Sequence, residues 1–550
     1  MAVAAVAILG VVAFGGWMLL GRATTPTAAL GPPGFGEAAA AAGLDHTYDG
    51  DIRFFTGGGV AVFDCDGDMF PELYLAGGER PAALFHNVGG MTNRGIAFSP
   101  LTDPTTARTG VTGAYPLDVD GDGFVDLAVL TIDGATLLRG LGDCRFEPAD
   151  DLWGFDGGGG WATAFSATWE SDAVLPTLAI GRYQTLDAAG RPSFGCDDNL
   201  LVRPEPGAVA RYAPPVVLSP GFCTLSMLFS DWDRSGRRDL RVSNDRQYYV
   251  GGQEQLWRVA PGEAPRLYTA DDGWVSMQIW GMGIASRDLT GDGYPEVYLT
   301  SQGDNKLQTL TEGPGRPTYR DIALRLGVTA AQPATGGDFL PSTAWHPEFA
   351  DVNNDGFVDL FVSKGNVFAQ EGYALRDPSD LFLGQPDGSF VQAAEAAGIL
   401  DFDRGRGAAL VDLNLDGFLD LVKLNLGAPV DLWANAGRGP PFGGDPGRLE
   451  PAHWLAVRVS QPGPNRDAIG AWVEVRIGDL IQRLELTVGG GHVGGQLGWL
   501  HVGLGPSERA EVRVTWPDGE EGPWLGVSAD GFYRVERGAS EAVRLGGPGG

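Results

Sequence analysis

Short apolar segments alternate with clusters of aspartate and glycine along residues 35–437. One such unit is Asp118-Val-Asp-Gly-Asp-Gly-Phe-Val-Asp126, and the apolar run 127–130 follows it at once. The segments on either side, 112–117 and 127–130, have the short apolar character of strands rather than the period of helices. The unit therefore predicts a β-hairpin whose turn carries four carboxylates.

This nine-residue unit recurs, which predicts a repeat fold. Copies start at Asp64, Asp118, Asp231, Asp288, Asp351 and Asp412, and a decayed seventh copy starts at Thr168. A strand-like segment follows each copy; these segments are 83–87, 136–139, 199–203, 255–258, 306–309, 380–383 and 431–434. A period of about 50–60 residues with short strands and glycine-rich turns is typical of propeller blades. We therefore predict an all-β fold with a seven-bladed β-propeller over residues 35–437.

Each loop carries side-chain oxygens at its positions 1, 3, 5 and 9, and this pattern predicts calcium sites. Calcium takes 6–8 oxygen ligands. An EF-hand is excluded because its twelfth position would be Val129, not glutamate, and because the flanks are strands. The predicted ligands are Asp64, Asp66, Asp68, Glu72, Asp118, Asp120, Asp122, Asp126, Asp231, Asp233, Ser235, Asp239, Asp288, Thr290, Asp292, Glu296, Asp351, Asn353, Asp355, Asp359, Asp412, Asn414, Asp416 and Asp420.

We expect about five or six calcium ions, each closing a hairpin whose carboxylates would otherwise repel one another. The copy that starts at Thr168 has lost the first aspartate and the glycine, so it is not expected to bind metal. The alternative for each loop is a plain turn, because Asp, Asn and Gly favour turns without any ion.

The repeat stops after residue 437. Residues 438–452 are rich in proline and glycine and read as a linker. The segments 454–459, 471–477, 482–488 and 511–516 alternate apolar and polar residues, as half-buried strands do. Residues 453–537 therefore predict a small β-sandwich-like module, followed by a tail over 538–550.

The N-terminus begins with an uncharged apolar run over residues 2–20. Residues 1–22 can be a membrane anchor or a signal peptide, and both indicate export to the periplasm, the cell surface or the medium. Residues 23–34 read as a linker. The alanine-rich segment 35–44 predicts a short helix, and the similar segments 319–327 and 390–399 predict pieces that precede a new blade.

The net charge of −31 argues against nucleic acid as a partner, because phosphate binding needs basic clusters. Four cysteines stand outside CxxC pairs, so zinc is not expected. In an exported chain they predict disulfides, with three possible pairings. We favour Cys65–Cys144 and Cys196–Cys223; four buried thiols are the alternative.

No motif for catalysis is present. The six histidines, at 46, 86, 346, 453, 492 and 501, follow no catalytic spacing, and neither GxSxG, HExxH nor a P-loop occurs. We therefore expect a binding protein for an unknown protein or glycan, which touches a membrane only through its N-terminal segment. A polysaccharide hydrolase or lyase on a propeller face is one alternative, and a purely structural envelope protein is another.

The loops, together with the blade entry Gly57-Gly-Gly-Val-Ala-Val-Phe-Asp64, resemble FG-GAP/VCBS repeats of integrin-α-type propellers over residues 54–435. The resemblance implies calcium bound by side chains at loop positions 1, 3, 5 and 9 and a carbonyl at position 7, and a role in adhesion. His453-Trp-Leu and the segments 465–471, 500–505 and 514–519 resemble the ASPIC/UnbV domain. The combination is similar to the cartilage acidic protein family.

Overall fold

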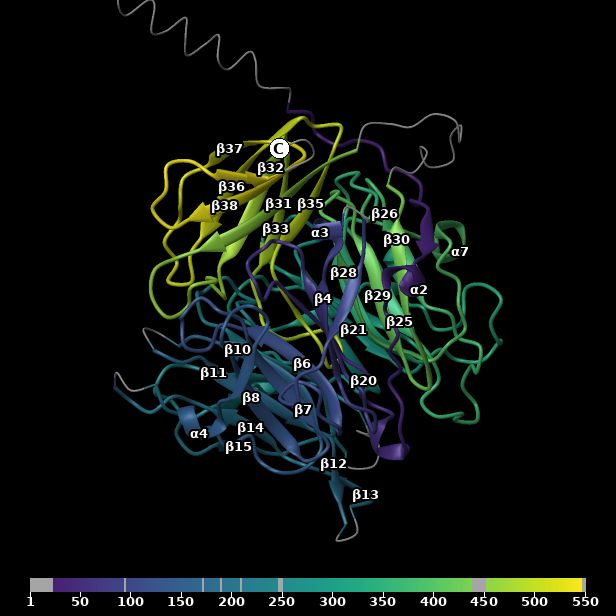
Figure 1. Cartoon of the computed structure of the whole chain (residues 1–550), viewed down its shortest axis with the longest axis vertical. Coiled ribbons are helices and arrows are strands. Elements are labelled where there is room, and N and C mark those ends of the chain that lie inside the picture. The colour runs from purple at the N-terminus through teal and green to yellow at the C-terminus, as the bar shows by residue number, and fades with distance from the viewer. Residues whose placement is uncertain are drawn as a thin grey trace, which may run out of the picture.

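Each acidic unit connects the first two strands of an antiparallel sheet. The computed structural model describes residues 23–92, 95–170, 173–187, 190–207, 210–245, 251–437 and 452–546. Within these ranges seven such sheets follow one another along the chain (Figure 1). The first strands are β2 (Val60–Phe63), β6 (Val111–Leu117), β10 (Ala162–Thr168), β16 (Thr224–Ser230), β20 (Gly281–Arg287), β24 (Ala344–Ala350) and β28 (Gly405–Val411). The second strands are β3 (Glu72–Leu75), β7 (Asp126–Thr131), β11 (Thr177–Arg182), β17 (Asp239–Asn244), β21 (Glu296–Ser301), β25 (Asp359–Lys364) and β29 (Asp420–Asn425).

The seven partner segments expected after the loops form the third strands. These are β4 (Ala83–Asn87), β8 (Gly134–Gly140), β14 (Asn199–Val202), β18 (Gln255–Arg258), β22 (Lys306–Leu310), β26 (Asp380–Gly384) and β30 (Ala428–Asn435). The fourth strands are β5 (Phe98–Leu101), β9 (Phe146–Pro148), β15 (Val216–Leu218), β19 (Arg266–Leu267), β23 (Tyr319–Asp321), β27 (Phe390–Gln392) and, for the last sheet, β1 (Phe35–Glu37).

The first strands lie around a common centre. Each first strand contacts the first strand of the next sheet, and β28 contacts β2. The first and last sheets are therefore neighbours, and β1 from the N-terminal end of the fold pairs with β30 near the other end of the repeat.

The segment 35–44 is not wholly helical, which corrects the sequence-based prediction. Phe35–Glu37 is strand β1, and only Ala39–Ala42 forms helix α2, which ends at Gly43 in the left-handed conformation. The segments 319–327 and 390–399 have the same form, with a fourth strand followed by α6 (Ala323–Leu326) and α7 (Ala394–Ala397). The remaining short elements are α3 (Gly89–Thr92), α4 (Asp150–Trp153), η1 (Ile52–Phe54), η2 (Ala270–Asp272), β12 (Gln184–Leu186) and β13 (Pro192–Cys196).

The C-terminal module consists of two four-stranded sheets. One has the order β35 (Leu500–Gly505), β31 (His453–Ser460), β38 (Gly531–Glu536), β39 (Val543–Gly546). The other has the order β33 (Leu480–Glu485), β32 (Trp472–Ile477), β36 (Arg509–Thr515), β37 (Leu525–Ser528). Apolar side chains of both sheets share one buried cluster. Strand β39 extends the module beyond residue 537, into the segment that the sequence suggested was a tail.

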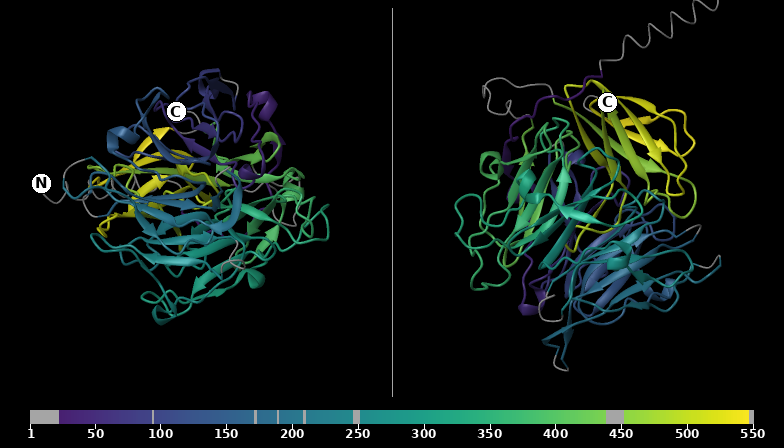
Figure 2. Two further views of the ribbon diagram at one scale, coloured as in Figure 1. Left: turned by 90° about the horizontal axis from the view of Figure 1, so that it is seen from below. Right: turned by 180° about the vertical axis from the view of Figure 1, so that it is seen from behind.

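The seven sheets, arranged around the common centre of their first strands, are called the ring below. A glycine-rich loop of the module, residues 486–495, enters the centre of this ring; we call it the central loop. Residues of the central loop form backbone bridges to β6, β10, β16 and β20. The following strand β34 (Gln496–Leu497) pairs with β2. The His492 N–H donates to His346 on β24, and the Gln496 side chain donates to the Leu410 carbonyl on β28. In the views of Figure 2 the yellow module lies against the blue to green sheets. The central loop and β34 together thus join the module to all seven first strands.

Glycines on the ring make room for the central loop. A Cβ atom on Gly59 or Gly113 would lie 1.9 or 1.8 Å from the carbonyl oxygen of Val493. No real side chain fits at such a distance, so both positions need glycine for the backbones to approach.

All four cysteines are paired, as Cys65–Cys144 and Cys196–Cys223, which confirms the favoured pairing. The first disulfide joins the acidic loop of the first sheet to the turn between β8 and β9 of the second sheet. The second fixes β13 to the residue before β16. Disulfides of this kind are typical of exported proteins.

Within the described residues, no helix has the length and apolar character that a membrane span requires. The apolar run 2–20, predicted as anchor or signal peptide, lies outside the described residues.

Candidate metal centres

The loops that start at Asp64 and Asp118 bring their first three acidic side chains together. One carboxylate oxygen from each of positions 1, 3 and 5 lies within 4.8 Å of the others in each loop. The backbone fixes this arrangement, because Asp118 accepts the N–H groups of Gly121 and Gly123 at 2.8 and 2.9 Å. The glycines of the unit take the left-handed conformation that the tight turn requires.

The acid at position 9 also links the loop to its sheet through hydrogen bonds. Asp126 accepts the N–H of Val119 within the loop and the N–H of Gly140 on β8, both at 2.7 Å. The loops starting at 64, 351 and 412 repeat both bonds, through Glu72, Asp359 and Asp420. These acids are buried at the base of the loop.

Burial raises the pKa of many loop carboxyls. The pKa of Asp118 rises to about 7 because the group is buried and because other carboxylates, Asp467 first among them, lie near it. Burial likewise raises the pKa of Asp412 to about 7 and that of Glu72 to about 9. An ion-free loop would therefore hold protons near neutral pH, and a divalent cation would displace them on binding.

The loops differ in the basic groups that face them. His86 lies 2.9 Å from Asp66, Arg139 contacts Asp120 and Asp122 at 2.8 and 2.6 Å, Arg237 contacts Asp239 at 2.9 Å, and Arg483 contacts Asp288 at 3.0 Å. Among the described residues, no Lys, Arg or His forms an ion pair with the acids of the loops 351–359 and 412–420. These two loops carry the least compensated negative charge.

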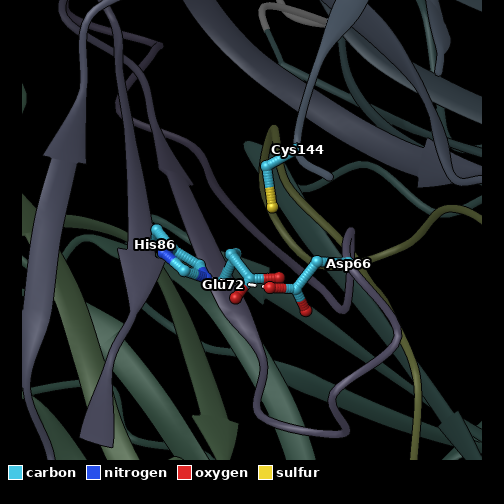
Figure 3. Close-up of side chains that lie close together, drawn as sticks. All are labelled: Asp66, Glu72, His86 and Cys144. Carbon is cyan, nitrogen blue, oxygen red and sulfur yellow. Dashed lines mark hydrogen bonds and ion pairs between the residues drawn. The ribbon is translucent and has the colours of Figure 1, made fainter. Parts of the chain in front are cut away.

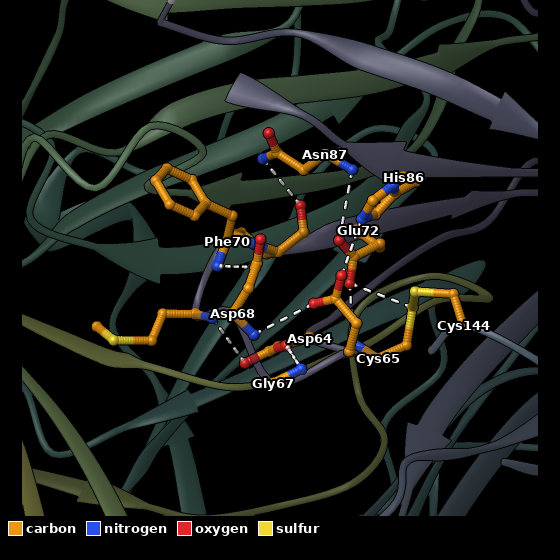
Figure 4. The surroundings of a disulfide bond; sticks show 12 residues. Asp64, Cys65, Gly67, Asp68, Phe70, Glu72, His86, Asn87 and Cys144 are labelled. Atoms are coloured by element: carbon orange, nitrogen blue, oxygen red, sulfur yellow. Dashed lines mark hydrogen bonds and ion pairs between the residues drawn. A yellow bond between two sulfur atoms is a disulfide. The ribbon is translucent and has the colours of Figure 1, made fainter. Parts of the chain in front are cut away.

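The first loop is also tied to a disulfide. Figure 3 shows Asp66 hydrogen-bonded to His86 beside Glu72, with Cys144 close by. The Sγ atom of Cys144 is bonded to Cys65, so it is not a thiolate ligand (Figure 4). The disulfide therefore anchors the loop, and the oxygen atoms remain as candidate ligands.

The decayed copy shows what replaces an ion site. Thr168 pairs with Thr177 across the hairpin, as residues before position 1 pair with position 9 elsewhere, so position 1 is Trp169 and the start at Thr168 is wrong by one residue. The side chain of Arg203 contacts Glu170 at 2.7 Å. A fixed cationic side chain thus neutralises Glu170.

The six acidic loops form the face on which the C-terminal module docks. Each of the six loops meets a residue of the module; the pairs are Asp64 with Arg458, Gly123 with Arg466, Asp231 with Glu485, Asp288 with Arg483, Asn354 with Gly505 and Gly417 with Trp454. The sequence offers no local signal for this contact, because its partners are far apart along the chain.

The donor set fits calcium. The candidate ligands are hard oxygen atoms on short loops whose turns the backbone already forms. All six loops lie within the described residues, and they contain no histidine and no free cysteine. When bound, calcium would supply the positive charge that these carboxylates lack. Ligation of the 24 residues named above stays a prediction.

Comparison with known proteins finds a family match in both the repeat region and the C-terminal module. Residues 64–129 and 288–362 match the FG-GAP-like repeat, and residues 461–542 match ASPIC and UnbV. This chain combines FG-GAP-like repeats with an ASPIC/UnbV module. It is 33% identical over 258 residues to cartilage acidic protein 1 of Xenopus tropicalis, covering 44% of this chain and 36% of that protein. It is 28% identical over 205 residues to the mouse protein of that name, covering 35% of this chain and 27% of that protein.

Solved structures resemble the chain only distantly. An Agrocybe aegerita lectin that recognises non-reducing terminal N-acetylglucosamine has a TM-score of 0.40 at 15% identity, covering 71% of this chain and 93% of the lectin. The extracellular domain of a two-component system protein of B. thetaiotaomicron has a TM-score of 0.39 at 9% identity, covering 92% of this chain and 60% of that one. These likenesses carry no conclusion about a ligand.

Proposed function

We propose that this chain is an exported recognition protein, in which calcium ions hold the loops of a seven-bladed β-propeller and a β-sandwich-like module caps the loop face. The FG-GAP-like repeats, the two disulfides and the ring of first strands support this proposal. Calcium is structural here, since each ion would close a hairpin and the face that carries it is covered by the module.

The loop 351–359 carries the calcium proposal. Asp351, Asp355 and Asp359 are each no more than 2% exposed, and within the described residues none of them forms an ion pair. Arg287 lies near Asp351 but outside ion-pair distance. Burying several carboxylates without a counter-charge is strongly unfavourable, so this loop needs either protons or a cation.

The face opposite the metal loops is the free face for recognition. The segments 331–343 and 366–379 lie there, because they precede β24 and follow β25 at the ends remote from the loop 351–359. Phe339 is 95% exposed, and Leu340, Phe368 and Leu375 are also exposed. Exposed aromatic and apolar groups of this kind are typical of binding surfaces. An exported protein of strong negative charge is suited to a protein or glycan partner and unsuited to nucleic acid.

Two carboxylates in the cavity beside the loops have structural partners. The cavity, of about 820 Å³ between the ring and the module, is lined by Glu348 and Glu485 together with Asp143, Asp467 and Glu536. Glu348 accepts the Leu410 N–H and a Gln496 N–H, and Glu485 accepts the Asp231 N–H and the Ser230 hydroxyl. Both acids therefore serve module docking, and we propose no reaction.

Calcium loading is expected to raise the melting temperature by at least about 10 °C relative to excess chelator. Each site filled at a hundredfold excess over its Kd adds about 2.7 kcal/mol, and about 1 kcal/mol moves the midpoint of a large domain by about 2–4 °C. Differential scanning calorimetry with and without EGTA, together with elemental analysis after dialysis, measures both the shift and the ion count.

Two variants test whether the ions lie in the loops. Asp412→Ala removes the position-1 side-chain oxygens and is expected to lower the count by one ion. Glu170→Gln, in the decayed copy, is expected to leave the count unchanged. A protein that retains no calcium and melts at the same temperature in EGTA would overturn the proposal.

A further inference from the structure

Residues 24–31 lie across the module and the sixth sheet; we call them the N-terminal strap. The Thr24 N–H donates to the Ser507 hydroxyl at 3.0 Å, and the Asp479 N–H donates to the Thr25 hydroxyl at 2.8 Å. Pro26 and Leu30 are buried, whereas Thr27 and Ala28 are exposed. The strap, which the sequence suggested was a linker, is therefore held at defined positions.

The strap lies directly on the loop 351–359. The Leu30 N–H donates to Oδ2 of Asp355 at 2.7 Å, and Nδ2 of Asn353 donates to the carbonyl oxygens of Leu30 and Gly31 at 3.2 and 3.4 Å. A Cβ atom on Gly356 would lie 2.5 Å from Pro26. The strap therefore contacts positions 3, 5 and 6 of the loop.

The module covers the same loop from its other side. His501 is hydrogen-bonded to the side-chain oxygen of Asn354 at 2.6 Å, the Gly505 N–H donates to the Asn354 carbonyl at 2.9 Å, and Gln482 donates to the Gly356 carbonyl at 3.2 Å. As a result Asn353 is 0% and Asp355 1% exposed. The loop is closed to solvent on both sides.

The strap also orients a candidate ligand. An asparagine side chain can present either its oxygen or its NH₂ group. The strap carbonyls accept from Nδ2 of Asn353, so its Oδ1 is the atom left for the loop interior, where it accepts the Asp355 N–H at 3.2 Å. Without the strap, this choice would be free.

The loop 412–420 provides a comparison within the same molecule. It has the same residue types at positions 1, 3, 5 and 9, but Asp416 is exposed and the NH₂ group of Asn414 donates to Asp416 at 2.9 Å. No part of the strap contacts this loop in the hydrogen bonds of the described residues. The two loops therefore share a donor set and differ in their covering.

We propose that the N-terminal strap and the module make the loop 351–359 an occluded calcium site, whose ion leaves only when the strap opens. This inference rests on the proposed calcium binding. The strap fixes the Asn353 oxygen toward the ion and blocks its exit, and the ion of the loop 412–420 exchanges freely. Local opening of a buried segment costs free energy that an exposed loop does not require.

Stopped-flow release into a fluorescent chelator tests the strap in the full chain. We expect one ion to leave at least about tenfold more slowly than the others, since each tenfold corresponds to about 1.4 kcal/mol of opening free energy. The double variant Pro26→Gly/Leu30→Gly is expected to lose this slow phase. The matched control Thr27→Gly/Ala28→Gly changes exposed strap positions and is expected to keep it.

Further measurements separate the strap from the loop and from folding. Asp355→Ala, which leaves no side-chain oxygen at position 5, is expected to remove the slow ion from the total count. Calcium content at saturation and the circular dichroism spectrum of Pro26→Gly/Leu30→Gly should match those of the parent chain, which shows that it folds. Release of all ions at one rate, or a slow phase that persists in Pro26→Gly/Leu30→Gly, would refute the strap inference and leave calcium binding intact. Absence of bound calcium would overturn both.

Discussion

Replacing Lys364 with methionine is expected to destabilise the protein by about 3–5 kcal/mol, the usual cost of leaving buried charges without their partner. The Lys364 ammonium is 0% exposed and lies 3.3 Å from Asp377 and 2.9 Å from Asp380, whose side chains are 0% and 1% exposed. It also donates to the Ser342 hydroxyl. Methionine keeps the length of the side chain and removes its charge, so the two aspartates lose their counter-ion.

Lys306→Met is the matched control, because Lys306 forms an ion pair with Asp321 at 3.3 Å in which both side chains are partly exposed. Ion pairs of this kind contribute about 0–1 kcal/mol. Thermal unfolding of both variants in saturating calcium measures the difference. Equal melting temperatures for Lys364→Met and the parent chain would show that the buried ion pairs do not stabilise the sixth sheet.

Replacing Gly113 with alanine is expected to displace the central loop and to cost about 1–3 kcal/mol or more, as overpacking does in a well-packed core. The new Cβ atom would lie 1.8 Å from the carbonyl oxygen of Val493, which is a backbone atom and cannot rotate away. Hydrogen exchange of residues 486–497 is expected to increase, because the loop would lose its bridges to the ring.

Gly526→Ala tests whether any new methyl group has this effect. A Cβ atom on Gly526 meets no atom within 4 Å, and its backbone is not in the left-handed region. We expect its melting temperature and its exchange over 486–497 to match the parent chain. Unchanged exchange in Gly113→Ala would contradict the close approach of the central loop and β6.

Local sequence patterns determined the repeat and most strands. The acidic units, their glycines and the apolar segments after them act through contacts within about thirty residues, so their period predicted the loops and the third strands β4 to β30. The same local logic failed for Phe35–Glu37. Its alanine-rich neighbours suggested a helix, but pairing with β30, which lies hundreds of residues away, makes it a strand.

The buried tryptophans show the same difference between what local sequence predicts and what long-range packing decides. The glycine-rich stretch 153–161 has no regular period that places its tryptophans, but both are packed in the interior, with Trp153 2% and Trp161 0% exposed. Trp161 lies against Tyr183, its neighbour across the β10–β11 hairpin, and against Phe55, which precedes the first sheet. The sequence shows that such side chains are large and apolar, but not which distant surface covers them.

By itself the sequence determined the all-β repeat and the candidate ligands, whereas it left three cysteine pairings open until the structure showed Cys65–Cys144 and Cys196–Cys223. Only the tertiary structure decided that the module covers the loop face, that the central loop fills the ring and that the strap closes the loop 351–359. These contacts join residues far apart along the chain; Leu30 and Asp355, for example, are 325 positions apart. Hydrophobic period and turn chemistry report a residue's near neighbours, whereas closing such distances depends on the packing of the whole chain.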